Sequence, residues 1–442
     1  MLTIKQIIAQ AEVLSLQKTL KVSGWVQSVR QNKFIEIKDG SSLKTLQLIS
    51  PPELTNQLKK VKFGSYLRAR GQLVLTPQQA QSCELKIEKI TALSAPDHDY
   101  PLQKKKTPLE TVRNYPHLRT KTNYFLALFR LRHSVSKAIH DFFDQEGFYY
   151  VPTPIITSND AEGAGATFNL ATNDKKPFFS KPAQLTVSGQ LHAEALVQGL
   201  GKVYTFSPCF RAEKSHTTRH LAEFWMVEAE LAPTSLATLL KLVQGLIKFI
   251  INSVLANAFE ELKYFERYQA KKIISKLVAI TKKDFNRLDY TQAIKVLKKS
   301  QFTFGSIKWG KDLKSEHEKY LCQYYQNQPL FITNYPKDLK AFYMKDRPDK
   351  KTVVGFDLIF PSIGELVGGS IREKTLQTLE TKAKKHGIDT KKLAWYLDLR
   401  RFGYAPSGGF GLGLERLIMF ISGTENIQDT LPFPCFHQQL EF

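Results

Sequence analysis

Three residues with complementary chemistry stand close together in FRAEKSHTTRHLAEFW, residues 210–225. The Arg211 guanidinium can donate two parallel hydrogen bonds to a phosphate or a carboxylate. The Glu213 carboxylate can accept from an exocyclic amine, and the Phe224 ring can stack on a purine. Each residue alone is more often a surface ion-pair member or a core aromatic. At the end of one strand and the start of the next, the set could hold a flat, anionic ligand.

A second segment, GGFGLGLERL at residues 408–417, combines a glycine-rich strand with the start of a helix. Glycines weaken a strand and usually mark a place where a ligand approaches the backbone. Arg416, at the start of the helix, could pair with a terminal phosphate. Between the two segments lies GFDLIFPSIGELVGGSIRE, in which Asp357 and Glu365 are spaced to meet from adjacent strands. Such carboxylates suit Mg²⁺ that bridges triphosphate oxygens, unless they only cap turns.

The elements that must position these residues follow from hydrophobic patterning. A helix is predicted over 124–146, strands over 203–210 and 224–231, and further strands near the C-terminal end. Because strands follow one another without regular intervening helices, we expect an α+β domain with a mainly antiparallel sheet flanked by helices. The Lys- and Ile-rich stretch 260–335 is expected to be helical and is interpreted as an insertion.

Short alternating segments from residue 20 to about residue 93 predict a small β-barrel. A proline- and lysine-rich stretch follows and is typical of a linker. We therefore expect a barrel domain at 1–100, a linker at 101–120 and a catalytic domain at 121–442.

The formal net charge is +22, from 63 Lys and Arg against 41 Asp and Glu. A surplus of this size favours a polyanionic partner, although solvated lysine faces would give the same count. The four cysteines form no CxxC pair, which argues against a zinc site and a disulfide framework. No secretion signal is visible, and the most apolar stretch, residues 236–255, is interrupted by four polar residues. We expect a soluble, cytoplasmic protein without a membrane partner.

The segments 210–225 and 408–417 resemble the second and third signature motifs of class II aminoacyl-tRNA synthetases, in the order that the family requires. The predicted helix followed by GFYYVPTPII resembles the first motif, whose helix and strand form the dimer interface, so the resemblance implies a homodimer. Nearly the whole chain is similar to the aspartyl/asparaginyl/lysyl subgroup, which joins a five-stranded OB barrel to the class II sheet; only the segment from about 260 to 325 lacks a matching motif.

Within that subgroup, LTVSGQLHAE, RHLAEFWMVEAE, GELVGGSIRE, WYLDLRRFG and NIQDTLPFP look asparaginyl. The resemblance implies ATP-dependent ligation of L-asparagine to tRNA(Asn) through an asparaginyl-adenylate, with Mg²⁺. An aspartyl or non-discriminating synthetase is the nearest alternative. An adenylate-forming, asparagine synthetase-like ligase should lack the barrel, and a non-catalytic tRNA-binding paralogue should have lost signature residues that are present here.

The resemblance also implies roles for individual residues, with Arg211 and Arg416 as the catalytic arginines. The residues implied for ATP are Arg211, Glu213, His220, Phe224, Glu365 and Arg416, and those implied for Mg²⁺ are Asp357 and Glu365. The residues implied for the amino acid are Glu162, Ser188, Gln190, Glu228 and Arg372. In the barrel, Arg30, Phe34 and Gln47 match positions that bind the central U of the anticodon, unless Phe34 belongs to the barrel core.

Selection between asparagine and aspartate must rely on charge and donor pattern, because the two side chains have nearly the same shape. Arg372 could donate to the side-chain oxygen of either ligand. Glu228 would accept from the NH₂ group of asparagine but would face the second oxygen of aspartate as a like charge. An unpaired acceptor–acceptor contact of this kind is worth roughly a hundredfold or more in discrimination.

Several positions depart from the family's usual residues. Lys214 and His216 replace Asn, Ser407 and Gly408 replace His-Ser, Ile371 replaces a common Gln, and Cys435 replaces an Arg. The contacts to the acceptor end of the tRNA and the affinity for ATP are the properties that these departures could change.

Overall fold

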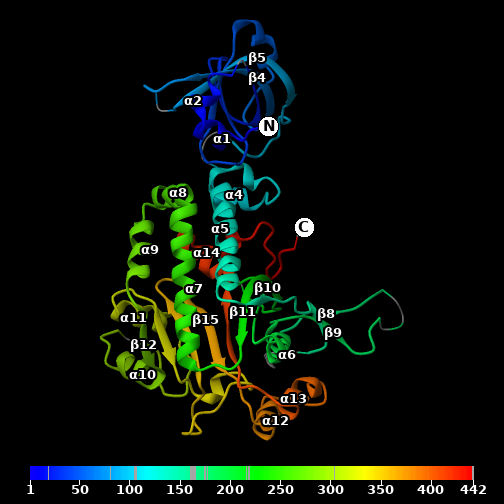
Figure 1. Cartoon of the computed structure of the whole chain (residues 1–442), viewed down its shortest axis with the longest axis vertical. Coiled ribbons are helices and arrows are strands. Elements are labelled where there is room, and N and C mark those ends of the chain that lie inside the picture. The colour runs from blue at the N-terminus through cyan, green and yellow to red at the C-terminus, as the bar shows by residue number, and fades with distance from the viewer. Residues whose placement is uncertain are drawn as a thin grey trace. The chain divides into compact units, whose positions relative to one another are not determined.

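The computed structural model describes residues 1–17, 19–79, 81–103, 107–159, 166–173, 176, 178–215, 217, 220–302 and 304–440. The chain forms two compact units, Met1–Arg130 and Leu131–Phe442. Figure 1 shows the elements of both units, and each unit is described by itself below.

The first unit is built around a closed barrel with the strand order β1-β2-β3-β5-β4. The strands are β1 (Leu20–Arg30), β2 (Phe34–Lys38), β3 (Leu46–Ile49), β4 (Tyr66–Leu75) and β5 (Cys83–Ser94). Alternate residues such as Ile35, Ile37 and Leu48 point into one buried core, which also takes Ile4 and Ile7. The predicted five-stranded OB barrel is therefore confirmed.

Short helices complete this unit: α1 (Ile4–Ala9), α2 (Ala11–Leu14), η1 (Pro52–Leu54), α3 (Thr55–Leu58), α4 (Leu109–Arg113) and η2 (Arg119–Lys121). Two of them, α4 and η2, occupy part of the predicted linker, whose Lys104, Lys105 and Lys106 lie outside the described residues. The long helix α5 (Asn123–Gln145) begins in the first unit and ends in the second.

The second unit contains an eight-stranded sheet with the order β12-β13-β14-β15-β16-β11-β10-β6. The strands are β6 (Tyr149–Tyr150), β10 (Lys202–Phe210), β11 (Glu223–Leu231), β12 (Asn286–Asp289), β13 (Leu330–Thr333), β14 (Gly355–Phe360), β15 (Gly364–Ile371) and β16 (Gly408–Gly413). All neighbours pair antiparallel except the two edge pairs, β12 with β13 and β10 with β6. The mainly antiparallel α+β domain is confirmed.

The stretch 260–335 is helical in part, as expected, and it also supplies two strands that the sequence pattern did not predict. Its elements are α8 (Phe259–Gln269), α9 (Ile273–Lys282), β12, α10 (Tyr290–Lys298), α11 (Ser315–Tyr324) and β13. Each strand has four residues, and every residue of β13 is buried, so no alternation was visible. The interpretation of this stretch as an insertion stays a prediction.

The remaining helices pack around the sheet (Figure 1). They are α6 (Gln190–Leu200), α7 (Leu236–Asn257), α12 (Leu376–Lys385), α13 (Ala394–Arg401), α14 (Leu414–Ser422), η3 (Lys337–Leu339) and η4 (Ile427–Thr430), and a small sheet holds β7 (Ile156–Thr157), β9 (Ala183–Leu185) and β8 (Asn169–Leu170). By length and hydropathy α7 could cross a membrane, despite its polar residues. Its apolar side, including Leu239, Val243 and Ile250, is fully buried within this unit.

Candidate active site

The strand register places two carboxylates at the ends of one row across the sheet. Asp357 on β14 pairs with Gly368 on β15, Gly368 pairs with Gly411 on β16, and Gly411 pairs with Glu228 on β11. Directly paired residues of neighbouring antiparallel strands face the same side of a sheet. The two middle positions are glycines and contribute no side chain of their own, although Oε1 of Glu365 and Cε of Met226 lie beside them. Glycines at such positions allow a ligand to approach the backbone closely.

A second row follows two residues further along, on the same face. It runs from Ser370 on β15 through Gly409 on β16 to Glu230 on β11. A Cβ atom at Gly409 would collide with the carbonyl oxygen of Ala229 and the carboxyl group of Glu230. Glycine is therefore required at this position. Gly409, Gly411 and Gly413 of the glycine-rich segment thus lie on the face that carries the candidate residues, whereas Gly408 lies on the other face.

The predicted nucleotide residues Arg211 and Phe224 lie next to each other at one end of the sheet. Arg211 directly follows β10, and Phe224 on β11 pairs with Cys209. The Arg211 guanidinium carbon lies 5.3 Å from the centre of the Phe224 ring. In the connecting loop, Nε2 of His220 lies 3.8 Å from a carboxylate oxygen of Glu213, and both side chains are about half exposed. The neighbouring His216 lies outside the described residues.

Arg416 lies at the same end of the sheet, in the first turn of α14. Strand β16 ends at Gly413, which pairs with Met226 near the start of β11. Nη1 of Arg416 donates to the backbone carbonyl oxygen of Glu365 at 2.6 Å. Arg211, Phe224, Glu365 and Arg416 come from four elements that meet at this end.

The carboxylates of Asp357 and Glu365 both lie against Gly368. A Cβ atom at Gly368 would lie 3.0 Å from Oε1 of Glu365 and 3.7 Å from Oδ1 of Asp357. The sequence did not predict the cation beside them: Nζ of Lys340 donates to Oδ1 and Oδ2 of Asp357 at 2.7 and 2.6 Å. Burial raises the pKa of Asp357 to about 6, although Lys340 opposes this effect.

A third carboxylate, Glu318 on α11, also faces this site. Burial, and then the negative charges of Glu365 and Asp357, raise the pKa of Glu318 to about 8, while Arg416 opposes the shift. No group of three or more His, Cys, Asp or Glu placed to hold a metal ion occurs in the part of the chain that the structure describes. Carboxylates so placed leave coordination positions of a cation that oxygens of a ligand could fill.

The predicted amino-acid residues Ser188 and Glu228 are in direct contact. The Ser188 hydroxyl donates to one carboxylate oxygen of Glu228, and the backbone N–H of Gly189 donates to the other at 2.8 Å. Burial raises the pKa of the fully enclosed Glu228. Nε2 of Gln190 is buried and has no hydrogen-bond partner among the residues that the structure describes, so a polar ligand group could satisfy it. The predicted Glu162 lies outside the described residues.

Arg372 bonds to Glu230, a residue that the sequence analysis did not select. Its Nε donates to Glu230 Oε2 at 3.2 Å, its Nη2 donates to Oε1, and its Nη1 donates to Ser370 at 2.7 Å. Both side chains are almost completely buried, at 3% and 1% exposed. A signal was present, because Glu230 follows Glu228 by two residues in a strand and must share its face.

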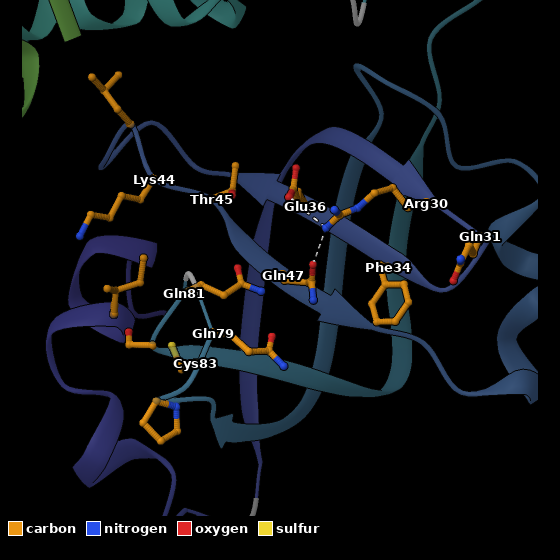
Figure 2. Close-up of a pocket in the computed structure, with 14 residues that line it drawn as sticks. Arg30, Gln31, Phe34, Glu36, Lys44, Thr45, Gln47, Gln79, Gln81 and Cys83 are labelled. Atoms are coloured by element: carbon orange, nitrogen blue, oxygen red, sulfur yellow. Dashed lines mark hydrogen bonds and ion pairs between the residues drawn. The ribbon is translucent and has the colours of Figure 1, made fainter. Parts of the chain in front are cut away.

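The three predicted barrel residues line one open pocket of about 990 Å³ (Figure 2). Nη2 of Arg30 donates to Oε1 of Gln47 at 2.8 Å, and Nε2 of Gln47 donates to the carboxylate of Glu84 at 2.5 Å. Phe34 is half-buried on the outside of β2, where its ring borders the pocket. Phe34 therefore does not belong to the barrel core, which Ile35 fills.

Comparison with known proteins connects this geometry to a family. The family model of class II tRNA synthetases (D, K and N) matches residues 108–437. The chain belongs to this family. The model of the OB-fold nucleic acid binding domain matches residues 20–93.

Individual relatives cover nearly the whole chain. The asparagine--tRNA ligase of Mycoplasma genitalium is 45% identical over 100% of this chain and 99% of its own length, and that of Bacillus cereus is 44% identical over 96% of each. Asparaginyl-tRNA synthetase from Pyrococcus horikoshii, whose crystal structure is complexed with asparaginyl-adenylate, has a TM-score of 0.89 and 29% identity over 99% of each chain.

Proposed function

We propose that this chain ligates L-asparagine to tRNA(Asn) through an asparaginyl-adenylate. One observation carries the proposal. Arg211 lies against Phe224, and Phe224 shares a face of β11 with the carboxylate of Glu228. Relatives that share 44–46% of the sequence and are named asparagine--tRNA ligases support the choice of amino acid.

In the first step, the α-carboxylate of asparagine attacks the α-phosphorus of ATP, and the bond to pyrophosphate breaks. Arg211 donates to the α-phosphate and to the attacking carboxylate, and Arg416 pairs with the γ-phosphate. Phe224 stacks on the adenine, Glu213 accepts from its amine, and His220 borders the nucleotide. In the second step, the terminal ribose hydroxyl of the tRNA attacks the acyl carbon, and AMP leaves. The side chains orient the reactants and stabilise charge, and none acts as a nucleophile.

Asp357 and Glu365 are the residues that would hold Mg²⁺ together with ATP. Two carboxylates that converge over a glycine provide the hard oxygen ligands that this ion prefers. When bound, Mg²⁺ neutralises negative charge on the triphosphate oxygens. Nζ of Lys340 donates hydrogen bonds to Asp357, so Lys340 compensates the charge of this carboxylate when no Mg²⁺ is bound.

Asparagine is selected at the other end of the face. Glu228 accepts from the side-chain NH₂ group, Arg372 donates to the side-chain oxygen, and Ser188 and Gln190, together with Glu162, bind the α-amino end. The contacts of Glu228 with Ser188 and with the backbone of Gly189 orient its carboxylate before the ligand arrives. A second oxygen on the ligand, as in aspartate, would face this carboxylate as a like charge.

The barrel reads the anticodon of the tRNA. The Phe34 ring stacks on the central U, Gln47 hydrogen-bonds its edge, and Arg30 contacts the adjoining phosphate. The hydrogen bond from Arg30 to Gln47 fixes the orientation of the Gln47 amide, which is the group proposed to read the base edge. The net charge of +22 favours such a polyanionic partner.

The proposal includes a cytoplasmic homodimer. Strand β6 lies at the edge of the large sheet, and its Tyr149 and Tyr150 are 61% and 53% exposed. Large apolar side chains at a sheet edge suit an interface between two copies related by a two-fold axis. None of the four cysteines, all of which lie in the described residues, forms a disulfide, and cysteines without disulfides suit a reducing compartment.

Charging of tRNA tests the proposal directly. The purified chain should attach radiolabelled asparagine, but not aspartate, to a tRNA(Asn) transcript. A tRNA(Asp) transcript shares the central U of the anticodon and provides the matched control. Charging of either transcript with aspartate at a comparable kcat/KM would instead establish an aspartyl or non-discriminating enzyme.

A further inference from the structure

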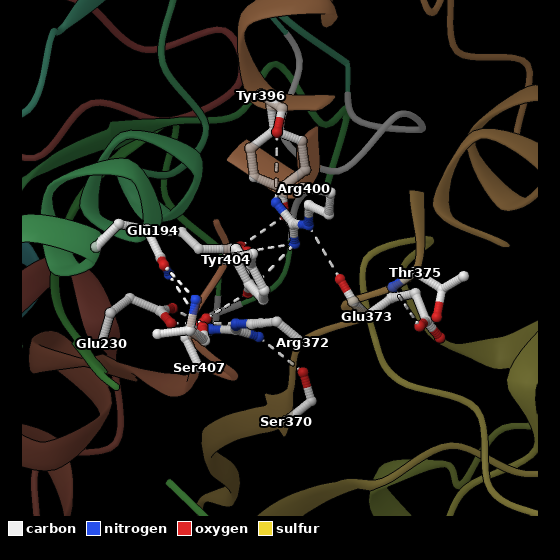
Figure 3. A network of polar contacts seen from close by, with 12 residues as sticks. Glu194, Glu230, Ser370, Arg372, Glu373, Thr375, Tyr396, Arg400, Tyr404 and Ser407 are labelled. Atoms are coloured by element: carbon white, nitrogen blue, oxygen red, sulfur yellow. Dashed lines mark hydrogen bonds and ion pairs between the residues drawn. The ribbon is translucent and has the colours of Figure 1, made fainter. Parts of the chain in front are cut away.

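Arg372 belongs to a buried network of polar contacts (Figure 3). The other members of this network have no role in the proposed chemistry. Its centre is Glu194 on α6, which is completely buried. This carboxylate accepts from the guanidinium of Arg400 on α13, from the hydroxyl of Tyr396 at 2.6 Å and from the hydroxyl of Tyr404 at 2.8 Å. Three donors from one segment thus converge on one buried carboxylate.

The network continues from Tyr404 to the backbone of Arg372. The hydroxyl groups of Tyr404 and Ser407 lie 2.5 Å apart, and Ser407 is fully buried. The carbonyl oxygen of Ser407 accepts from the backbone N–H of Arg372 at 2.9 Å. Nε of Arg400 donates to the carbonyl oxygen of Glu373 at 3.0 Å. Residues of this network therefore hold the backbone N–H of Arg372 and the carbonyl of the next residue, Glu373.

The same network also reaches the opposite side of the proposed amino-acid site. Gln190 and Glu194 lie four residues apart on α6, which places them on one face of the helix. The network thus links the helix that presents Gln190 to the strand end that presents Arg372. A shift of either element would change the distance between two groups that contact asparagine.

The buried charges make this arrangement sensitive to single changes. Arg372 pairs with Glu230, and Arg400 pairs with Glu194, all in the protein interior. Burial raises the pKa of Glu230 to about 7, and the charges of Glu194 and Glu228 add to the shift, while Arg372 opposes it. Since buried ion pairs depend on good geometry and on every remaining hydrogen bond, loss of one hydroxyl should displace the charged groups.

We propose that Tyr404 and the buried Glu194–Arg400 pair are positioning residues that hold Arg372 in register with asparagine, and that they set the KM for the amino acid without setting the KM for ATP. This inference rests on the proposed asparagine site. It assigns a role to residues that touch neither substrate. A purely structural role would instead lower stability and affect both substrates alike.

Tyr404→Phe tests the proposal because it removes one hydroxyl and little volume. In ATP–pyrophosphate exchange, the KM for asparagine should rise about tenfold, the size of effect expected for one buried hydrogen bond in a charged network. The KM for ATP should stay within about twofold of the wild-type value. Tyr290→Phe is the control, since the hydroxyl of the fully buried Tyr290 also donates a hydrogen bond, to the carbonyl oxygen of Lys311 at 2.6 Å, whereas Tyr404 is half-buried. This control should change neither KM.

Two further variants separate positioning from stability. Ser407→Ala should raise the KM for asparagine to a similar extent, and the double variant with Tyr404→Phe should be no worse than either single variant, because both changes break the same link. Glu194→Gln retains the shape of the side chain and one acceptor oxygen. Its KM for asparagine should lie between the values of the wild type and of Tyr404→Phe. The melting temperatures of Tyr404→Phe and Tyr290→Phe should fall by similar amounts.

Equal increases in both KM values, or a Tyr404→Phe variant that behaves like Tyr290→Phe, would overturn the positioning role. Wild-type exchange that another amino acid supports and asparagine does not would overturn the proposed function, and this inference with it. Asparagine-dependent exchange that all three network variants leave unchanged would overturn the inference alone.

Discussion

The candidate active site and the barrel pocket both place an arginine against an acceptor, but in opposite surroundings. In the active site, the side chains of Arg372 and Glu230 are 3% and 1% exposed. In the barrel, the side chain of Arg30 is 56% exposed beside Glu36, which is 30% exposed. The first pair is held in the interior on several sides, whereas the second lies on an open surface.

This difference suits two kinds of ligand. A small amino acid offers few atoms, so discrimination requires fixed, desolvated charges whose geometry is set before binding. A nucleic acid offers phosphates and bases over a long surface, so several weaker, salt-sensitive contacts can add up. Single changes in the active site should therefore have larger effects than single changes in the barrel.

The largest effect is expected for Arg211→Ala. In the proposed mechanism Arg211 contacts both the α-phosphate and the attacking carboxylate, so its loss should lower asparagine-dependent pyrophosphate exchange by about a thousandfold or more. Arg287→Ala is the control, because Arg287 is exposed on the edge strand β12. Near-normal exchange by a folded Arg211→Ala variant would reject the nucleotide site.

Glu228→Gln should mainly affect selection. The ratio of kcat/KM for asparagine over aspartate should fall by roughly a hundredfold, because the like charge that opposes aspartate is removed. Glu261→Gln changes another buried glutamate, on α8, and should leave the ratio unchanged. If the ratio stays the same in Glu228→Gln, selection depends on other residues.

In the barrel, Phe34→Ala should raise the KM for tRNA(Asn) by about ten- to a hundredfold through loss of one stacking contact. Pyrophosphate exchange, which needs no tRNA in this proposal, should not change. Trp25→Ala removes an exposed aromatic of the barrel that lies outside the pocket, and serves as the control. A parallel loss of exchange in Phe34→Ala would contradict the separation of the two sites.

The smallest expected effect is the contribution of Glu318 to the pH dependence of the free energy of unfolding. The pKa of Glu318 is raised to about 8 in the folded protein, from 4.5, chiefly by burial. The folded state therefore retains a proton that the unfolded state loses, and this stabilisation is complete below about pH 4.5 and is lost as the pH rises through 8. Glu318→Gln should remove this loss.

Melting temperatures of the ligand-free protein between pH 5.5 and 8.5 measure this effect. The wild type should lose about 2–4 °C more than Glu318→Gln over this range. Glu316→Gln, a neighbouring and exposed glutamate, should follow the wild type. Identical pH profiles for the wild type and Glu318→Gln would show that Glu318 carries no shifted proton.

The sequence predicted those parts of the molecule whose signals are local. Alternation predicted the barrel strands, and short motifs selected Arg211, Phe224 and Arg416. Pairings between distant parts of the chain were not predictable, because local pattern can show that Glu230 shares a face with Glu228 but not which side chain it bonds to. Arg372 bonds to Glu230 across 142 positions, and Arg400 to Glu194 across 206. The family resemblance predicts that Arg372 binds the substrate, and only the fold shows which residues hold its side chain.

ATP–pyrophosphate exchange with each of the twenty amino acids tests the central claim most directly. It asks whether the face that carries Arg211 and Glu228 activates one amino acid, and which one. The account predicts exchange with asparagine and, at most, about one hundredth of that kcat/KM with aspartate. Strong exchange with aspartate, or none with asparagine, would contradict it.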